Sequence, residues 1–158
     1  MQLRRLSSAA LAALAMFGAA PALGQDTAEP AAPRIVDIAA HVAEASLRFG
    51  IPEQWIYAVM RAESAGRIGA VSSAGAMGLM QVMPDTWADL RIRHALGRDP
   101  FEPRDNILAG TAYLREMWDR YGNVAAMLAA YNAGPGRYDE YRLADRPLPA
   151  ETRAYVAS

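Results

Sequence analysis

The chain has 158 residues without a cysteine, and its 16 basic residues, 17 acidic residues and two histidines give a formal net charge of −1. This length suits one globular domain with a sizeable core, and the absence of cysteine excludes disulfides and thiol chemistry. The two histidines are isolated and the arginines are scattered, so we expect no metal site, no cofactor and no nucleic-acid partner.

Residues 1–24 have the pattern of a secretory signal peptide. Arg4 and Arg5 form a positive start, residues 6–20 are an apolar run, and residues 22–24 read Ala-Leu-Gly, which is a small-x-small cleavage pattern. The alternative is a membrane anchor, but the run is shorter than the roughly 20 residues of a spanning helix. We therefore predict export with cleavage, and an uncleaved segment would instead tether the protein.

Residues 25–34 are predicted to be a flexible linker. Pro30 and Pro33 stand there in a polar, alanine-rich stretch, and prolines at this spacing rule out a regular element. The folded domain is therefore expected to occupy residues 35–158.

Two helices are predicted at the start of this domain. The first is indicated by apolar residues that share one helical face and stop just before Gly50: Ile35, Ile38, Val42, Ala45 and Phe49. Pro52 is tolerated at a first helical position, and Glu53 is favourable near the positive helix start. A second helix is therefore expected from Pro52 to about Ser64.

Glu63 is the unusual residue of the second helix, because it shares the helical face of Ile56, Val59 and Met60. An unpaired buried carboxylate is costly. Burial and the negative end of the helix dipole both favour the protonated form, which suits a general acid that protonates a leaving oxygen. The alternative is that Glu63 pairs with an arginine or caps a turn.

The remaining elements are also predicted to be helical. Residues 65–77 are rich in glycine, serine and alanine and indicate a loop, and residues 78–82 indicate a short helical piece. Further helices are expected at residues 84–95, 107–121 and 124–131, with a break at 132–136 and a last helical turn or two at 151–156. No segment shows sustained alternation of apolar and polar residues, so the fold should be all-α.

Three later motifs place polar side chains at the ends of segments. They contain Gln81 after Gly-Leu-Met, Tyr131 and Asn132 at the end of an apolar run, and Glu151 and Tyr155 four residues apart. An amide both donates and accepts hydrogen bonds, which suits recognition of an N-acetyl group or a sugar hydroxyl. Taken singly, these residues also have structural explanations, because Gln81 can satisfy loop backbone, Asn132 can cap, and both tyrosines can be core residues with a wet tip.

Together and in this order, the motifs resemble those of the soluble lytic transglycosylases of bacterial cell walls. The matching stretches are Glu63-Ser64, Ser72 nine positions on, Gly75–Gln81, Ala130–Gly136 and Glu151–Val156. The resemblance covers nearly all of the chain after the linker. It implies a single goose-type lysozyme-like helical domain with a substrate cleft.

The same resemblance implies that Glu63 is the catalytic acid and base. It places seven further residues at the substrate cleft: Ser72, Met80, Gln81, Tyr131, Asn132, Glu151 and Tyr155. The expected reaction cleaves the β-1,4 bond between N-acetylmuramic acid and N-acetylglucosamine without water and leaves a 1,6-anhydro end. Ordinary glycosidases use two carboxylates, whereas this reaction needs no carboxylate nucleophile.

The resemblance also implies a periplasmic, monomeric protein that acts on peptidoglycan strands, and small relatives often open the wall for a secretion or conjugation apparatus. Two other functions stay open, namely a muramidase that hydrolyses the same bond and a wall-binding assembly protein without activity. One departure concerns residues 65–69, which read Ala-Gly-Arg-Ile-Gly where relatives carry an aromatic-Asn-Pro element. We therefore expect an altered loop there and, with it, one altered subsite.

Overall fold

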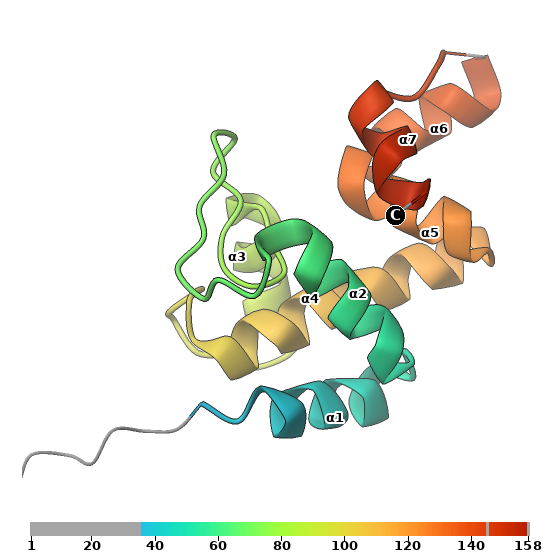
Figure 1. Cartoon of the computed structure of the whole chain (residues 1–158). Coiled ribbons are helices and arrows are strands. Elements are labelled where there is room, and N and C mark those ends of the chain that lie inside the picture. Colours follow the sequence, from blue (N-terminus) through green and yellow to red (C-terminus); the bar gives the residue numbers. More distant parts are fainter. Residues whose placement is uncertain (1–35, 145, 158) are drawn as a thin grey trace, which may run out of the picture. The chain divides into compact units, whose positions relative to one another are not determined.

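The structure is a computed structural model that describes residues 36–144 and 146–157. The predicted signal peptide and linker lie outside the described residues. Seven helices follow one another along the described part of the chain (Figure 1): α1 Ile38–Phe49, α2 Glu53–Ser64, α3 Pro84–Arg93, α4 Pro103–Tyr121, α5 Val124–Ala133, α6 Pro135–Ala144 and α7 Ala150–Ala157. Among these residues no strand forms and only two isolated β-bridges occur, which confirms the all-α prediction.

Helix α4 is the central element of the core. It is the longest helix, and it contacts α1, α3 and α5. Ile107, Leu108 and Leu114 on this helix are fully buried. Trp118 packs against Trp55 of α2 with the two ring centroids 5.6 Å apart. The hydrophobic effect therefore packs α1, α3 and α5 against α4, since burying each large apolar side chain contributes about 1.5–3 kcal/mol.

Local signals in the sequence account for several helix ends. Gly50 and Gly122 close α1 and α4 in the left-handed conformation, with φ of 65° and 63°, which glycine adopts without steric cost. Pro84 stands in the first turn of α3, where its missing N–H has no partner to lose. Asn123 accepts a hydrogen bond from the Ala126 N–H and so caps α5.

The predicted short helix at residues 78–82 is wrong. Met77 and Val82 instead pair in an antiparallel bridge that closes a tight turn. Gly78 and Gln81 in this turn have φ of 75° and 48°, and residues with positive φ cannot belong to a right-handed helix. The loop between α2 and α3 therefore has a defined, non-helical backbone.

The predicted break at residues 132–136 is also only partly right. Helix α5 continues to Ala133 and stops at Gly134, with φ of 85°. Pro135 then starts α6, which the sequence analysis missed. None of the described residues of α6 is fully buried, so this helix lacks the apolar stripe by which the other helices were predicted.

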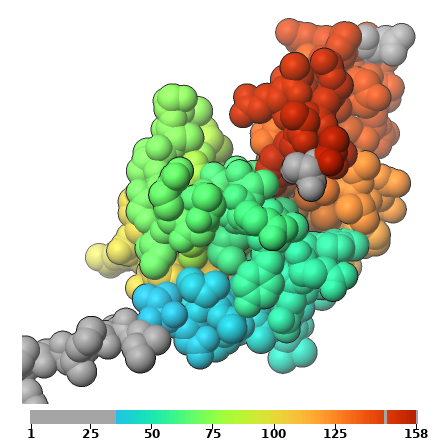
Figure 2. Space-filling view, in the orientation of Figure 1, coloured from blue at the N-terminus to red at the C-terminus, as the bar shows by residue number. Residues whose placement is uncertain are grey.

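A groove lies on the surface of the domain between the loop after α2 and the C-terminal helices. Figure 2 shows this groove between the green and red parts of the chain, with residues of α2 at its floor. Helix α7 contacts α5, and α5 contacts α4. The groove is therefore bordered by segments that are far apart in the sequence. None of the described helices is both long and apolar enough to cross a membrane.

Candidate active site

Glu63 lies in the last turn of α2, on the same side as the buried Ile56, Val59 and Met60. Its carboxyl group is partly buried, and this burial is the main reason why its pKa rises from 4.5 to about 7. The negative charge of Glu151 raises the pKa further, while a hydrogen bond from Tyr155 lowers it. Near neutral pH, Glu63 is therefore able to give and to take a proton, as a catalytic acid and base must.

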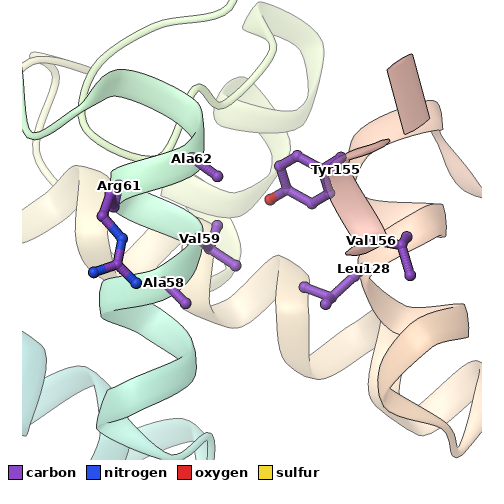
Figure 3. Close-up of a pocket in the computed structure, with 7 residues that line it drawn as sticks. All are labelled: Ala58, Val59, Arg61, Ala62, Leu128, Tyr155 and Val156. Atoms are coloured by element: carbon purple, nitrogen blue, oxygen red, sulfur yellow. The ribbon is translucent and has the colours of Figure 1, made fainter. Parts of the chain in front are cut away.

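Tyr155 and Glu151 reach Glu63 from α7. The Tyr155 hydroxyl donates a hydrogen bond to the Glu63 carboxylate, and in Figure 3 it points towards α2. Burial raises the pKa of Tyr155, and the negative charge of Glu63 raises it as well, so this hydroxyl keeps its proton. Glu151 stands in the first turn of α7 and is exposed.

A contact between two helices holds α7 in this place. The Thr152 hydroxyl donates a hydrogen bond to the Asn132 side-chain oxygen over 2.9 Å. Thr152 is the buried residue of α7, and Asn132 lies in the last turn of α5. Asn132 therefore anchors α7 in this structure. It also lines the second of the two pockets described below.

A pocket of about 220 Å³ lies between α2 and the C-terminal helices, on the side of Tyr155. Its lining is mostly apolar: Ala58, Val59, Arg61, Ala62, Leu128, Tyr155 and Val156. Figure 3 shows the Arg61 side chain directed away from this pocket. Tyr155 thus belongs both to the pocket wall and to the hydrogen bond with Glu63.

A second pocket, of about 270 Å³, brings three predicted substrate residues together. It is lined by Gln81, Val82, Met83, Thr86, Tyr113, Tyr131, Asn132, Ala133 and Gly134. Tyr113 was not predicted from the sequence as a site residue, and its ring packs against that of Tyr131 with centroids 5.4 Å apart. Exposed aromatic faces and amides are groups that bind sugar rings, their hydroxyls and their N-acetyl groups. This pocket therefore has suitable chemistry for an amino sugar.

Tyr131 and Met80 form a connected pair behind this pocket. The buried Tyr131 hydroxyl donates a hydrogen bond to the Met80 carbonyl oxygen over 2.7 Å. Burial and the charge of Glu63 raise the pKa of Tyr131, so this hydroxyl also stays neutral. The Met80 side chain is fully buried against Gly110 and Thr111. Met80 is therefore not exposed to a substrate, and it shapes the cleft from within the core.

Gln81 and Ser72 mainly organise the loop between α2 and α3. The Gln81 amide nitrogen donates to the carbonyl oxygens of Ala70 and Gly78, at 3.1 and 2.9 Å. These two bonds use both of its N–H groups, so only the amide oxygen faces other partners. The Ser72 hydroxyl accepts a hydrogen bond from the Ala76 N–H at 3.0 Å. The Gln81 amide nitrogen therefore satisfies loop backbone, as the structural alternative predicted, whereas its amide oxygen is left for another partner.

The comparison with known proteins identifies the family of this fold and site. The family model described as "Transglycosylase SLT domain" matches residues 40–152. The chain belongs to this family. A transglycosylase of Enterobacteria phage PRD1 is 39% identical over 93 residues, which are 59% of this chain and 33% of that protein. The membrane-bound lytic murein transglycosylase C of Glaesserella parasuis is 38% identical over 109 residues, which are 60% of this chain and 30% of the relative.

Solved structures agree with this assignment to the SLT family. The X-ray structure of an inactive mutant of the lytic transglycosylase Slt from Pseudomonas aeruginosa superposes with a TM-score of 0.67 and 33% identity. The match covers 75% of this chain and 22% of that chain. It confirms the predicted lysozyme-like helical fold. This SLT domain chain spans about a third of the length of the curated relatives it matches.

Ser64 and Asn106 are buried polar residues of the SLT domain, and no role was predicted for either of them from the sequence. The buried Ser64 hydroxyl donates to the Leu79 carbonyl oxygen at 2.8 Å and accepts from the Gly66 N–H at 3.1 Å. It thereby ties the end of α2 to both sides of the loop. Asn106 is a fully buried amide within α4. A polar residue in the apolar stripe of a helix was the available signal for it.

The altered stretch after Ser64 forms a sharp turn in this SLT domain. Ala65 and Gly66 both adopt left-handed conformations, with φ of 53° and 78°. The backbone then returns so that the Gly78 N–H reaches the Ala70 carbonyl oxygen at 2.8 Å. Among the described residues, no group of three or more His, Asp or Glu side chains lies close enough to hold a metal ion.

Proposed function

We propose that this SLT domain is a peptidoglycan lytic transglycosylase with Glu63 as its catalytic acid and base. The proposal rests on one observation, which is a partly buried carboxyl group of pKa about 7 that accepts a hydrogen bond from Tyr155 in the wall of a pocket. Among the described carboxylates, Glu151 is the one whose charge acts on Glu63, and it is exposed in the first turn of α7. A partly buried acid whose carboxylate neighbour is exposed matches the lytic reaction better than a two-carboxylate hydrolysis.

In the first step, protonated Glu63 donates its proton to the glycosidic oxygen between N-acetylmuramic acid and N-acetylglucosamine. The bond from the anomeric carbon to this oxygen breaks, and the bonding electrons stay with the leaving sugar as a hydroxyl. The carbonyl oxygen of the substrate's own N-acetyl group supplies electrons to the anomeric carbon. Glu63 is left as a carboxylate, which the hydrogen bond from Tyr155 stabilises.

In the second step, the Glu63 carboxylate takes the proton of the C6 hydroxyl of the muramic acid. The C6 oxygen attacks the anomeric carbon and displaces the N-acetyl oxygen, which closes the 1,6-anhydro ring. Glu63 is again protonated, and no water is consumed. Attack within one molecule has a high effective molarity, so it prevails over water as long as the bound glycan strand limits water near Glu63.

The remaining polar residues have roles in holding the sugar. The Gln81 amide oxygen is an acceptor for an N-acetyl N–H, because both amide hydrogens are used within the loop. Tyr131 and Asn132 border the same pocket. Ser72 shapes the loop beside it, and Glu151 acts on Glu63 through its charge.

The place of action follows from the substrate and the predicted signal peptide. We propose that the protein is exported to the periplasm and acts there as a monomer on glycan strands. A local role in opening the wall for a secretion or conjugation apparatus is part of the same proposal. The matched relative in Glaesserella parasuis is named a membrane-bound murein transglycosylase, which supports an extracytoplasmic site of action.

The test is product analysis with purified peptidoglycan. The protein from residue 25 onwards is incubated with the wall, and released muropeptides are identified by mass spectrometry. We expect anhydro-muropeptides from the wild type and a loss of at least about 10³-fold with Glu63→Gln. An unchanged rate with Glu63→Gln contradicts the catalytic role, and no products from a folded wild type point to a wall-binding protein without activity.

A second candidate function is a muramidase that hydrolyses the same bond. The observation that favours it is Glu151, a second carboxylate whose charge acts on Glu63. In that case water attacks the anomeric carbon and the products carry a reducing end. Products that are one water heavier than the anhydro forms would establish hydrolysis and overturn the lytic reaction.

A further inference from the structure

Asn106 forms an unusually complete set of hydrogen bonds beneath the candidate active site. Its side-chain oxygen accepts from the Met80 N–H at 2.8 Å, and its amide nitrogen donates to the carbonyl oxygens of Met77 and Pro100 at 3.0 and 2.8 Å. The residue is fully buried. These partners determine the amide orientation, because a flipped side chain would set its oxygen against two carbonyl oxygens.

The space around this amide is tightly filled. A Cβ on Gly78 would lie 2.4 Å from the Asn106 amide nitrogen, so only glycine leaves room for the contact. On the other side of Met80, a Cβ on Gly110 would lie 2.5 Å from the Met80 Cβ. The Met80 backbone is therefore held at its N–H by Asn106, and the Met80 side chain packs against α4.

The next peptide group, between Met80 and Gln81, contacts a side chain of the site. Its Met80 carbonyl oxygen accepts a hydrogen bond from the Tyr131 hydroxyl at 2.7 Å. The bond ties the buried hydroxyl end of Tyr131 to the loop and so fixes the tilt of its ring. Tyr131 borders the pocket with Gln81 and Asn132, so the bond holds one wall of that pocket in place.

We propose that Asn106 is a positioning residue for the reaction, which acts by holding the Met80 backbone so that the Tyr131 side chain keeps its place in the wall of the sugar pocket. The proposal rests on the proposed function, since it concerns the same site. The described contacts form one path, from the Asn106 amide through the Met80 backbone to the Tyr131 hydroxyl. A sugar that lies against a fixed Tyr131 keeps its N-acetyl carbonyl oxygen directed to the anomeric carbon.

A double-mutant cycle tests this path. Asn106→Ala, Tyr131→Phe and the double variant are compared with the wild type for kcat and KM on soluble glycan strands. We expect Asn106→Ala to lower kcat about tenfold in the wild type, but less than about twofold where Tyr131 is already Phe. Equal losses in both backgrounds would overturn the proposal, because Asn106 would then act without Tyr131.

Asp105→Asn serves as the matched control on the same helix. Asp105 is nearly as buried, but its carboxylate accepts from the Gly97 N–H at 2.7 Å, away from Met80. Its substitution should change kcat by the same factor in both backgrounds, whatever it does to stability. A coupling of Asp105 with Tyr131 as large as that of Asn106 would mean that general loosening of α4 explains the effect, and would overturn the proposal.

Amide exchange in the wild type tests the geometry without any variant or activity. The Met80 N–H, bonded to a buried side chain, should exchange with solvent as slowly as the core amides of α4. Fast exchange of Met80 would overturn the proposal even in an active enzyme. Slow exchange with an inactive wild type would instead show that the contact stands and that the proposed function has failed.

Discussion

Glu63 shows how a single side chain acquires its chemistry from three neighbours of different kinds. Burial disfavours its charge, Glu151 repels it, and Tyr155 stabilises it by a hydrogen bond. Together these three effects give a pKa of about 7, so the Glu63 carboxyl group is able to donate its proton at neutral pH. Each of these effects can be changed separately by substitution.

The pH dependence of the rate should report this carboxyl group. Because the first step needs protonated Glu63, kcat/KM should fall tenfold per pH unit above about pH 7. The measurement is the initial rate of muropeptide release between pH 5 and pH 9 at constant ionic strength. A profile that stays level to pH 9 would contradict the role of Glu63 as the acid.

Tyr155→Phe should move this alkaline limb upward. The hydrogen bond from Tyr155 lowers the Glu63 pKa, so its removal leaves burial and Glu151 to raise the pKa further. We expect a shift of about half a unit to one unit towards higher pH, together with a lower maximal rate. The same pH series measures both quantities, and a limb that moves to lower pH would contradict the assignment.

Glu63→Gln should make the stability less dependent on pH. The pKa of Glu63 is raised in the folded state, so between pH 4.5 and about 7 this residue is ionised in the unfolded chain but still protonated in the folded protein. The free energy of unfolding of the wild type therefore falls as the pH rises through this window. Urea unfolding at pH 4 and pH 8 should show Glu63→Gln gaining about 3 kcal/mol relative to the wild type over this range.

At the scale of elements, the loop between α2 and α3 is as well determined as a helix, although it has no regular pattern. Ser64, Gln81 and Asn106 bind its backbone from three sides. Its close approach to α4 depends on Gly78 and Gly110, where side chains would meet Asn106 and Met80. The substrate pocket is thus set by how near this loop packs to α4.

Gly110→Ala tests that packing. The new Cβ would lie 2.5 Å from the Met80 Cβ, so we expect a loss of about 1–3 kcal/mol in the free energy of unfolding and a lower rate. Gly136→Ala in α6 is the matched control, because a Cβ there meets nothing within 4 Å. Its stability should stay the same or increase slightly, since alanine favours helices. Equal unfolding midpoints for both variants would contradict the close packing.

At the scale of the whole domain, the site joins α2, the following loop, α5 and α7. Helix α7 carries Glu151 and Tyr155, and its main neighbour is α5. The Thr152 hydroxyl bonds to Asn132 and sets the orientation of α7. Activity should therefore depend on a contact that lies beyond the reacting atoms.

Thr152→Val should separate activity from stability. Losing one hydrogen bond costs only about 1 kcal/mol, but α7 can then shift and withdraw Tyr155 from Glu63. We expect about a tenfold lower kcat with a small change in melting temperature, measured by muropeptide release and calorimetry. Thr152→Ser, which keeps the hydroxyl, should retain nearly the wild-type rate; equal losses for both variants would contradict a role of this bond.

Sequence reasoning succeeded where the signal lies within a few residues. The stops at Gly50 and Gly122 were predicted from local backbone preferences, and so was the place of Glu63 on the buried face of α2. The family was evident from the order of four motifs. Helix α6 was missed because none of its described residues is buried. Its sequence therefore has no stripe of apolar residues at helical spacing from which a helix is predicted.

The sequence by itself determined the helical class, most helix ends and the place of Glu63 on the apolar face of α2, because these depend on residues near one another in the chain. Only the tertiary structure decided that Met80 is buried and that the Gln81 amide oxygen is the side-chain atom left for a sugar. It also decided that Asn106 accepts a hydrogen bond from the Met80 N–H. The physical reason is that hydrogen-bond partners come from segments 11 to 51 residues apart. Packing of distant segments, rather than local preference, determines which polar atoms remain available for chemistry.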